Sequence, residues 1–467
     1  MNGFDRHRER VQRIASKVEE AFEEGEELAV SHSSNHSVRT RTSSDKVVVD
    51  VDDLDHFVEV DEDSKTALVE PDISMRQLVD KTLQHGLLPH VVPEFPEITM
   101  GGAVEGGGGE SSSFKYGLVG KNCNMFELVT GKGEIVEASP ENRSDLFQET
   151  ICSYGSTGIL TEIHMDLIEA KEFVKLKYVK VASFKEMLEL IDERMEENEG
   201  LDFMDGIMFS KDRGVLMLGA FSDGDQDLPV SKFSKPWNEW FYIHAENASE
   251  KPGVYQELIP VKEYLFRYNY GSFWASKYGF KDYGVPFNRL TRTLLHPLMD
   301  TSTAYDLSIH GRDTENKMIL QDIVTARSDV QELFDWCDEK LGVYPIWVLP
   351  AQTNDKAELA PNYLDADYTV NLGIWGVPES GNVKELKKGL EGKVLQLEAR
   401  KTLYAQQFFT EQQFWSQYNR EKYREVRKSY KAEGMFPSVY EATHVDQVKD
   451  IEVSKSLLKD LKKQLPF

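Results

Sequence analysis

Apolar residues at helical spacing open the chain. Between residues 4 and 28 they are Phe4, Val11, Ile14, Val18 and Phe22. This pattern predicts an amphipathic helix that ends near Gly25, because apolar residues three or four positions apart share one helix face. Ala29 and Val30 then begin a predicted short strand, which leads into a polar loop over residues 31–41.

Short strands and glycine turns dominate the rest of the first third of the chain. The predicted strands cover residues 47–51, 57–60, 66–69, 126–130, 134–138 and 159–167. Their β-branched residues and the turn residues between them are typical of antiparallel hairpins. Ser74 is placed to cap a helix over 75–85, which Gly86 ends, and a second short helix is predicted over 146–152.

The composition changes after Ala170, where a second structural unit begins. The elements predicted beyond this point are 173–181, 184–197, 344–349, 368–374 and 412–430, with an aromatic-rich stretch over 237–287. We therefore predict an α+β fold in three parts. Residues 1–170 form two α+β lobes, 171–430 form an antiparallel sheet with helices, and 431–467 form a helical segment that returns to the first unit.

The balance of charge limits the possible partners. The chain has 54 Lys and Arg residues against 80 Asp and Glu residues, which gives a formal net charge of -26. Such a surface repels polyanions, so nucleic-acid binding is not expected. The same balance argues against docking on anionic lipid through a basic patch.

Cysteine usage and the N-terminus indicate a cytoplasmic setting. Cys123, Cys152 and Cys337 are far apart and odd in number, without the spacing of a zinc site, so a reducing compartment and no metal are expected. The charged N-terminus lacks the apolar core of a signal peptide, and no apolar run approaches the length of a membrane span. Peripheral contact with a membrane stays open.

Three segments combine glycine or hydroxyl residues in patterns that suit ligand binding. They are the polar loop 31–41, the stretch 99–117 with its four consecutive glycines, and the turn 152–160. Glycine allows a ligand to approach the backbone closely, and successive N–H groups can form an anion site. Taken singly, each segment is equally a solvated loop, a linker or an ordinary turn, and 99–117 matches neither a Walker loop nor a Rossmann fingerprint.

In this order, the three segments resemble the FAD-binding domain of the vanillyl-alcohol oxidase / p-cresol methylhydroxylase (PCMH) type. The resemblance implies that the first holds the FAD pyrophosphate, the second follows the ribityl chain and isoalloxazine, and the third lies near the adenine and pyrophosphate. Backbone dipoles can bind such a dianion in an acidic protein. The implied FAD-binding residues are Ser31, His32, Ser33, Ser34, Asn35, His36, Ser37, Pro93, Glu94, Thr99, Gly101, Gly102, Gly106, Gly109, Glu110, Ser111, Ser112, Gly155, Ser156, Gly158 and Ile159.

Further motifs are similar to the delta(24)-sterol reductase family, in order, from about residue 28 to residue 441. They include Val69-Glu70-Pro71, Pro93-Glu94, Gly101-Gly102, Glu110-Ser111-Ser112-Ser113, Lys115-Tyr116-Gly117-Leu118, Gln321-Asp322, Leu403-Tyr404-Ala405 and Phe436-Pro437-Ser438-Val439-Tyr440. The resemblance implies an FAD-dependent oxidoreductase that reduces a C=C bond of an apolar, sterol-like substrate with NADPH as electron donor. Members of that family carry an N-terminal membrane helix, which this sequence does not show, and this difference puts the sterol substrate in question.

Reduction of an isolated C=C bond needs a proton donor, because an unpolarised alkene accepts hydride poorly. The candidate catalytic residues are Tyr116, Lys115 and Tyr404, with Glu110 and Asp322 as second choices. Lys115 or Arg267 would stabilise negative charge on the reduced flavin, and His90 would face the flavin.

Two other functions remain open at this point. His36 falls where some relatives bond flavin covalently, which favours an FAD-dependent oxidase that acts on an alcohol-type substrate with oxygen. The missing membrane helix leaves room for a non-catalytic lipid-binding protein. The order of motifs favours the reductase, and the whole interpretation requires that the three segments meet around one flavin.

Overall fold

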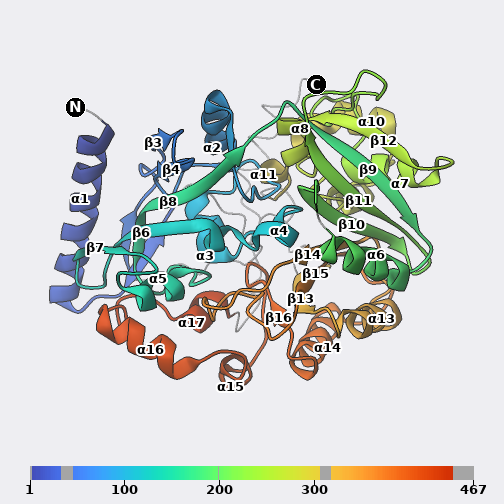
Figure 1. The fold of residues 1–467 in the computed structure, drawn as a ribbon. Coiled ribbons are helices and arrows are strands. Elements are labelled where there is room, and N and C mark those ends of the chain that lie inside the picture. The colour runs from blue at the N-terminus through green and yellow to red at the C-terminus, as the bar shows by residue number, and fades with distance from the viewer. Residues whose placement is uncertain (1–2, 33–45, 198, 306–316, 445–467) are drawn as a thin grey trace.

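The structure is a computed structural model that describes residues 3–32, 46–197, 199–305 and 317–444 (Figure 1). The expected α+β fold is confirmed, with mostly antiparallel strands and helices that pack on two sheets. The expected N-terminal helix is α1 (Gly3–Glu24), which buries Val11, Ile14 and Val18 on one face. Two short strands after it, β1 (Leu28–Ser31) and β2 (Val47–Asp50), pair in parallel.

The first large sheet carries six strands. They are β3 (Phe57–Asp61), β4 (Thr66–Val69), β5 (Leu87–Pro89), β6 (Cys123–Val129), β7 (Ile135–Ala138) and β8 (Ile159–Glu169). The sheet runs in the order β3-β4-β8-β6-β7, and β5 also pairs with β8. Alternating apolar residues explain the packing: Ala67 and Val69 of β4 point into the core while their neighbours are only partly buried.

Short helices connect these strands. They are α2 (Met75–Thr82), the 3-10 helix η1 (Leu83–His85), α3 (Met100–Gly106), α4 (Ser113–Tyr116), the 3-10 helix η2 (Val119–Asn122) and α5 (Ser144–Thr150). As predicted, Ser74 caps α2, in a capping box with Gln77, and Gly86 follows η1 in the left-handed conformation.

The second sheet is antiparallel and has eight strands in the order β12-β9-β11-β10-β14-β15-β13-β16. The strands are β9 (Phe173–Val181), β10 (Phe203–Ser210), β11 (Arg213–Ser222), β12 (Tyr255–Pro260), β13 (Ile319–Ala326), β14 (Ile346–Ala351), β15 (Thr369–Gly376) and β16 (Arg400–Lys401). The first sheet ends at β8 and the second begins at β9, so the chain passes between them over residues 170–172. The domain limits predicted from the sequence stay a proposal.

The remaining helices follow β9 along the chain. They are α6 (Phe184–Glu196), α7 (Phe241–Glu250), α8 (Val261–Leu265), α9 (Ser276–Asp282), α10 (Arg289–Leu295), the 3-10 helix η3 (His296–Leu298), α11 (Thr301–Ala304), α13 (Val330–Lys340), α14 (Val383–Gln396), α15 (Glu411–Trp415), α16 (Arg420–Ser429) and α17 (Val439–Thr443). The last two run beneath the first sheet (Figure 1), where the Arg427 Nε donates to the Ser156 carbonyl at 3.0 Å.

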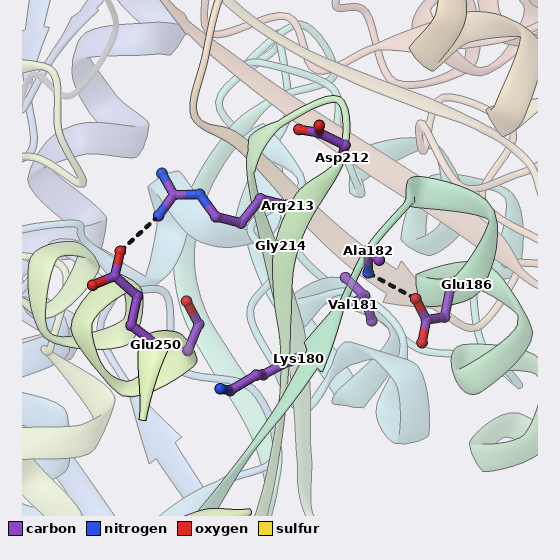
Figure 2. Close-up of a pocket in the computed structure, with 9 residues that line it drawn as sticks. Lys180, Val181, Ala182, Glu186, Asp212, Arg213, Gly214 and Glu250 are labelled. Atoms are coloured by element: carbon purple, nitrogen blue, oxygen red, sulfur yellow. Dashed lines mark hydrogen bonds and ion pairs between the residues drawn. The ribbon is translucent and has the colours of Figure 1, made fainter. Parts of the chain in front are cut away.

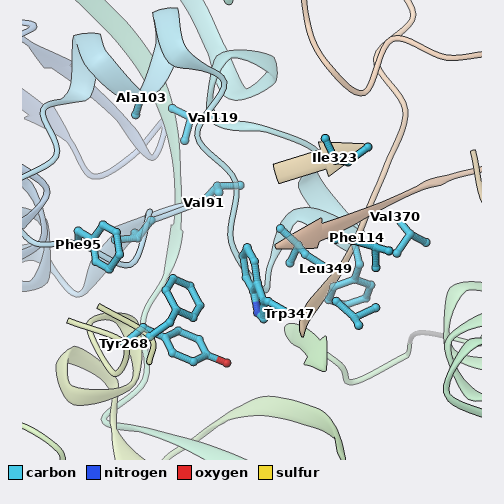
Figure 3. Packing of buried hydrophobic residues seen from close by; sticks show 14 of the residues in the cluster. Val91, Phe95, Ala103, Phe114, Val119, Tyr268, Ile323, Trp347, Leu349 and Val370 are labelled. Carbon is cyan, nitrogen blue, oxygen red and sulfur yellow. The ribbon is translucent and has the colours of Figure 1, made fainter. Parts of the chain in front are cut away.

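One hydrophobic core crosses both sheets. Figure 3 shows Phe95 and Phe114 from the first unit together with Tyr268, Trp347 and Val370 from the second. The short helix α4 lies between the sheets (Figure 1). At its first residue, Ser113, the carbonyl accepts a hydrogen bond from the Gln352 N–H of the second unit at 3.0 Å. The two units therefore share a continuous apolar interface rather than a flexible hinge.

Three predicted elements differ from the structure. The glycine-rich stretch, which by itself is equally a flexible loop, begins as helix α3 because the Thr99 side chain caps it and accepts a hydrogen bond from the Gly102 N–H. The predicted helix 412–430 is two helices, since Asn419 caps a new one at α16. The strand predicted at 344–349 begins two residues later, after Pro345, which has no N–H for a ladder.

Candidate functional site

Two of the three predicted binding segments lie side by side. The Cys152 N–H donates to the Val104 carbonyl at 3.1 Å, and the Tyr154 N–H donates to the Glu105 carbonyl at 3.2 Å. Cys152, Tyr154 and Gly155 all have positive φ, so the backbone turns tightly where it is hydrogen-bonded to the end of α3. Segments 99–117 and 152–160 are thus joined along one edge.

The third segment is only partly described. Ser31 closes β1 and His32 follows it, whereas Ser33, Ser34, Asn35, His36 and Ser37 lie outside the described residues. Leu28 of β1 packs in the same small apolar cluster as Ile159, the first residue of β8. The strand that leads into the polar loop therefore starts beside the strand that leaves the 152–160 turn.

The glycines of these segments fall into two groups. A side chain on Gly101 would stand 2.7 Å from the Pro71 Cβ, and one on Gly109 would stand 2.7 Å from Leu118. Gly158 is equally confined, at 2.9 Å from the Val129 carbonyl oxygen. These three glycines are explained by close packing within the protein.

Gly106 and Gly155 are different, because no atom lies within 4 Å of the place where their Cβ would stand. Both are partly exposed and belong to the two joined segments. An extended ligand can approach the backbone here without meeting a side chain, as a dinucleotide requires. The residues present therefore fit FAD along this edge.

A carboxyl group also lies at this edge. Glu105 accepts hydrogen bonds from the Ser153 hydroxyl, at 3.4 Å, and from the Gly155 N–H. Burial raises the pKa of Glu105 to about 8, although these two hydrogen bonds oppose the change. A carboxyl that is largely neutral at pH 7 adds little negative charge beside a bound pyrophosphate.

Other residues predicted to bind FAD already have partners within the protein. Pro93 lies against Gly108, Thr99 caps α3, and the Ser156 carbonyl accepts from Arg427. Gly102 is exposed at the start of α3, and Ser112 is buried before α4. Their roles toward FAD stay predictions.

Glu110 and Ser111 belong to a buried ion pair between the two units. The Arg267 guanidinium lies 2.8 Å from Glu110 and 3.1 Å from Asp205, and all three side chains are buried. The Ser111 hydroxyl bonds Glu110 and lies 3.1 Å from the Tyr264 hydroxyl. Burial alone would lower the pKa of Arg267, but the adjacent carboxylates raise it, so the guanidinium stays charged.

A second cluster of ionisable side chains forms where the two units meet. Tyr404 donates to Asp322 at 2.6 Å and accepts from the Trp375 indole N–H at 3.0 Å. Asn371 donates to the other Asp322 oxygen at 2.7 Å. Burial raises the pKa of Asp322 to about 6 despite these hydrogen bonds, and burial followed by the Asp322 charge raises that of Tyr404.

Glu94 and Tyr305 complete what we call the acid cluster, which consists of Glu94, Tyr305, Asp322 and Tyr404. Burial raises the pKa of Glu94 to about 8, and the charges of Glu110 and Asp322 add to this effect. Burial and the Glu94 charge also raise the pKa of Tyr305. Both side chains keep partial solvent exposure, so the cluster is deeply set and still accessible.

Aromatic rings border the acid cluster. Phe95 lies 5.8 Å from Phe273 and 6.2 Å from Tyr305, and Phe273 lies 4.2 Å from Trp375, between ring centroids. Apolar walls with a few directed polar groups are typical of small-molecule sites at domain interfaces. The buried Asn371 Oδ1 has no hydrogen-bond partner among the described residues, which suits a donor from a bound group.

The predicted catalytic residues have different partners in the structure. Tyr404 and Asp322 meet in the acid cluster, whereas Lys115 binds Asp202 at 3.1 Å and Tyr116 stacks on His90 at 4.4 Å. Tyr305, which directly follows α11, was missed because a single tyrosine carries no sequence signal.

A separate surface pocket of about 380 Å³ lies on the second sheet (Figure 2). It is lined by Lys180, Val181, Ala182, Glu186, Asp212, Arg213, Gly214, Ser249 and Glu250. Arg213 is paired with Glu250 at 3.2 Å across it. None of its lining residues belongs to the acid cluster or to the predicted FAD segments, so we do not assign the reaction to it.

Two classes of site are not seen in the described part of the chain. Among these residues, no group of three His, Cys, Asp or Glu side chains is arranged to hold a metal ion. No helix in the same ranges has the length and apolar character needed to cross a membrane.

Comparison with known proteins places these features in a family context. An FAD binding domain model matches residues 9–139. A delta(24)-sterol reductase homolog of Caenorhabditis elegans is 28% identical over 84% of this chain and 77% of its own length. The human delta(24)-sterol reductase is 26% identical over 93% and 86%, and that of Arabidopsis thaliana is 28% identical over 84% and 75%.

A further match covers a shorter part of the chain. Cytokinin dehydrogenase 4 of Oryza sativa is 30% identical over 139 residues, which is 30% of this chain. The resemblance inferred from the sequence motifs is thus confirmed over most of the chain. The chain carries a PCMH-type FAD binding domain and is an FAD-binding oxidoreductase similar to the delta(24)-sterol reductases.

Proposed function

We propose that this protein reduces a C=C bond of an apolar, sterol-like substrate, with FAD as cofactor and NADPH as electron donor. The observation that carries the proposal is the acid cluster, a set of proton-holding side chains bordered by aromatic rings at the junction of the FAD binding domain and the second sheet. The names of the similar proteins support the substrate class.

Bound FAD, once reduced, supplies the hydride for one alkene carbon. The Tyr404 hydroxyl donates the proton to the other carbon, and Asp322 is the reserve that returns a proton to the Tyr404 oxygen. This order follows from the hydrogen bonds: an ionised Asp322 holds the Tyr404 proton at 2.6 Å, whereas a protonated Asp322 donates to that oxygen and releases the proton toward substrate. The donor is therefore active when Asp322 is protonated, with its pKa near 6.

The residues around this pair hold its geometry. Trp375 donates to the Tyr404 oxygen and Asn371 to Asp322, so both acids have one orientation. The aromatic faces of Phe273 and Trp375 favour positive charge that develops on an alkene carbon when the proton arrives. Arg267, which the sequence analysis named with Lys115 as a candidate to stabilise the reduced flavin, is bound between Glu110 and Asp205 and supports this arrangement from the core.

The test begins with the purified protein and its absorption spectrum. We expect bound flavin, bleaching of its visible band by NADPH without oxygen, and recovery of the band when a sterol with a Δ24 double bond is added. Mass spectrometry should show a product with two added hydrogens. Oxidised flavin that ignores NADPH but is reduced by an alcohol, and remains attached after acid precipitation, would instead support an oxidase with flavin bonded to His36.

We further propose three parts, namely an FAD domain over 1–170, a substrate domain over 171–430 and a returning segment over 431–467, and a cytoplasmic location. Cys123, Cys152 and Cys337 are all buried and unpaired, which suits a reducing compartment. Limited proteolysis followed by mass spectrometry tests the domain limits, and imaging of the tagged full-length chain tests the location.

A further inference from the structure

The surface of the second unit carries an apolar patch around α10. Its members are Leu290, 67% exposed, Leu294, 64%, Trp237, 62%, and Phe287, 38%. We call these four residues the α10 patch. Large apolar side chains gathered at one surface, rather than scattered singly, mark an interaction site in a soluble fold.

Helix α10 is oriented with its leucines outward by defined contacts. Its Arg292 is buried, with the guanidinium 5.7 Å from the Trp240 ring and 5.5 Å from the Phe287 ring. Leu290 and Leu294, four positions apart, then necessarily face solvent together. A capping box at Asn288 holds the start of the helix.

Trp237 belongs to the same surface although it is distant in sequence. Its carbonyl accepts a hydrogen bond from Arg289 of α10 at 3.5 Å. Trp240, three residues later, is buried and lies 5.4 Å from the Phe287 ring. The segment before α7 and helix α10 therefore form one surface, at the edge of the molecule far from α1 (Figure 1).

The stretch of chain that carries α10 has a charge balance opposite to that of the whole chain. Residues 271–296 contain four basic side chains, Lys277, Lys281, Arg289 and Arg292, against one acidic side chain, Asp282, while the chain as a whole has a net charge of -26. Of these, Lys281, Arg289 and Asp282 are exposed and Arg292 is buried, and Lys235, two residues before Trp237, is also exposed. The balance of the whole sequence had argued against a basic patch, but residues 271–296 carry a local excess of basic side chains.

We propose that the α10 patch docks the protein on the surface of an anionic phospholipid membrane. Leucine and phenylalanine side chains enter the boundary between headgroups and acyl chains, tryptophan lies at the headgroup level, and the basic rim is attracted to anionic lipid. A protein partner with a purely apolar surface would gain nothing from the basic rim. A membrane surface uses both features, which is why the patch fits lipid better.

The patch also lies on the chain segment that leads to the acid cluster. From α10 the chain continues through η3 and α11 to Tyr305, and it is held by the Gly271 N–H, which donates to the Met299 carbonyl at 2.9 Å. The Thr301 hydroxyl donates to the Asn269 carbonyl at 2.8 Å. If the proposed function holds, an apolar substrate dissolved in a membrane would enter beside this segment; the docking itself does not depend on that function.

The test is sedimentation of the full-length protein with vesicles, in the oxidised state and without substrate. We expect binding to phosphatidylcholine vesicles that contain phosphatidylglycerol, weaker binding to pure phosphatidylcholine, and loss of the difference at high salt. The double variant Leu290→Ser/Leu294→Ser should lower the partition coefficient at least about tenfold. The variant Lys281→Glu/Arg289→Glu should weaken binding to the anionic vesicles alone.

The matched control removes apolar side chains of similar exposure elsewhere, as Val254→Ser/Val377→Ser, and should bind as the unchanged protein does. The proposal is overturned if the unchanged protein does not bind anionic vesicles, or if the leucine variant binds equally well. It is also overturned if light scattering shows a dimer that the leucine variant dissociates, because the patch would then join two copies. Bleaching of the flavin by NADPH without vesicles reports on the proposed function separately.

Discussion

Arg267 offers the sharpest test of what holds the two units together. The variant Arg267→Met removes the cation between Glu110 and Asp205 but keeps a long side chain against the rings of Tyr264 and Tyr268, which lie 4.1 and 4.6 Å from the guanidinium. Two buried carboxyl groups then lose their shared partner. We expect the first effect on stability and only a secondary effect on turnover.

The magnitude follows from distance and burial. Unit charges 2.8 and 3.1 Å apart attract by about 5–6 kcal/mol each at an effective dielectric constant of roughly 20. Desolvation of the three charges offsets much of this gain. Removal of Arg267, however, leaves the desolvation cost of Glu110 and Asp205 without compensation. Breaking a buried pair in this way costs about 3–5 kcal/mol of unfolding free energy.

The assay is urea unfolding followed by tryptophan fluorescence, with flavin release as a second signal. Arg213→Met is the matched control, since Arg213 also pairs with two carboxylates, at 2.6 and 3.2 Å, but at the surface, where about 1 kcal/mol or less is expected. Adding Glu110→Gln to Arg267→Met should recover part of the loss. If Arg267→Met is no more harmful than Arg213→Met, the reasoning about the buried pair is wrong.

Three further predictions concern the proton donor, the N-terminal helix and the glycines. Tyr404→Phe should lower the rate of C=C reduction about a hundredfold or more at unchanged flavin content. The rate of the unchanged protein should fall as the pH rises through about 6, and Asp322→Asn should remove this dependence. A flat pH profile in the unchanged protein refutes the assignment. Burial would lower the pKa of His7, but hydrogen bonds to Glu127 and Glu70 and the charge of Glu162 raise it to about 9. A group whose pKa is raised on folding stabilises the folded state fully below pH 6.5, and this stabilisation is lost as the pH rises through about 9. Helix α1 should therefore lose roughly 3 kcal/mol of docking energy across that range, which would be seen as faster hydrogen exchange. The variant His7→Gln should show no such change with pH. Gly101→Ala should cost about 1–3 kcal/mol of unfolding free energy because its Cβ would stand 2.7 Å from the Pro71 Cβ. Gly106→Leu should leave thermal stability unchanged and lower FAD affinity at least about tenfold. An equal loss of stability in both variants would contradict the assigned difference.

Local features of the fold were predictable from the sequence. The spacing of Val11, Ile14 and Val18 defined α1, and Ser74 and Gly86 marked the ends of α2 and η1. Such signals act over a few residues, through helix periodicity and backbone capping, and need no distant partner. The order of motifs along the chain likewise carried the family resemblance, which the comparisons confirm.

Only the tertiary structure decided which residues form the site. It joined Glu110 to Arg267, it paired Lys115 with Asp202 and Tyr116 with His90, and it divided the glycines into packed and open ones. It also gathered Glu94, Tyr305, Asp322 and Tyr404 from far-apart stretches into the acid cluster. Periodicity tells which face of an element is buried, but the partner of that face depends on how the two sheets meet, and this is set by packing across the whole chain.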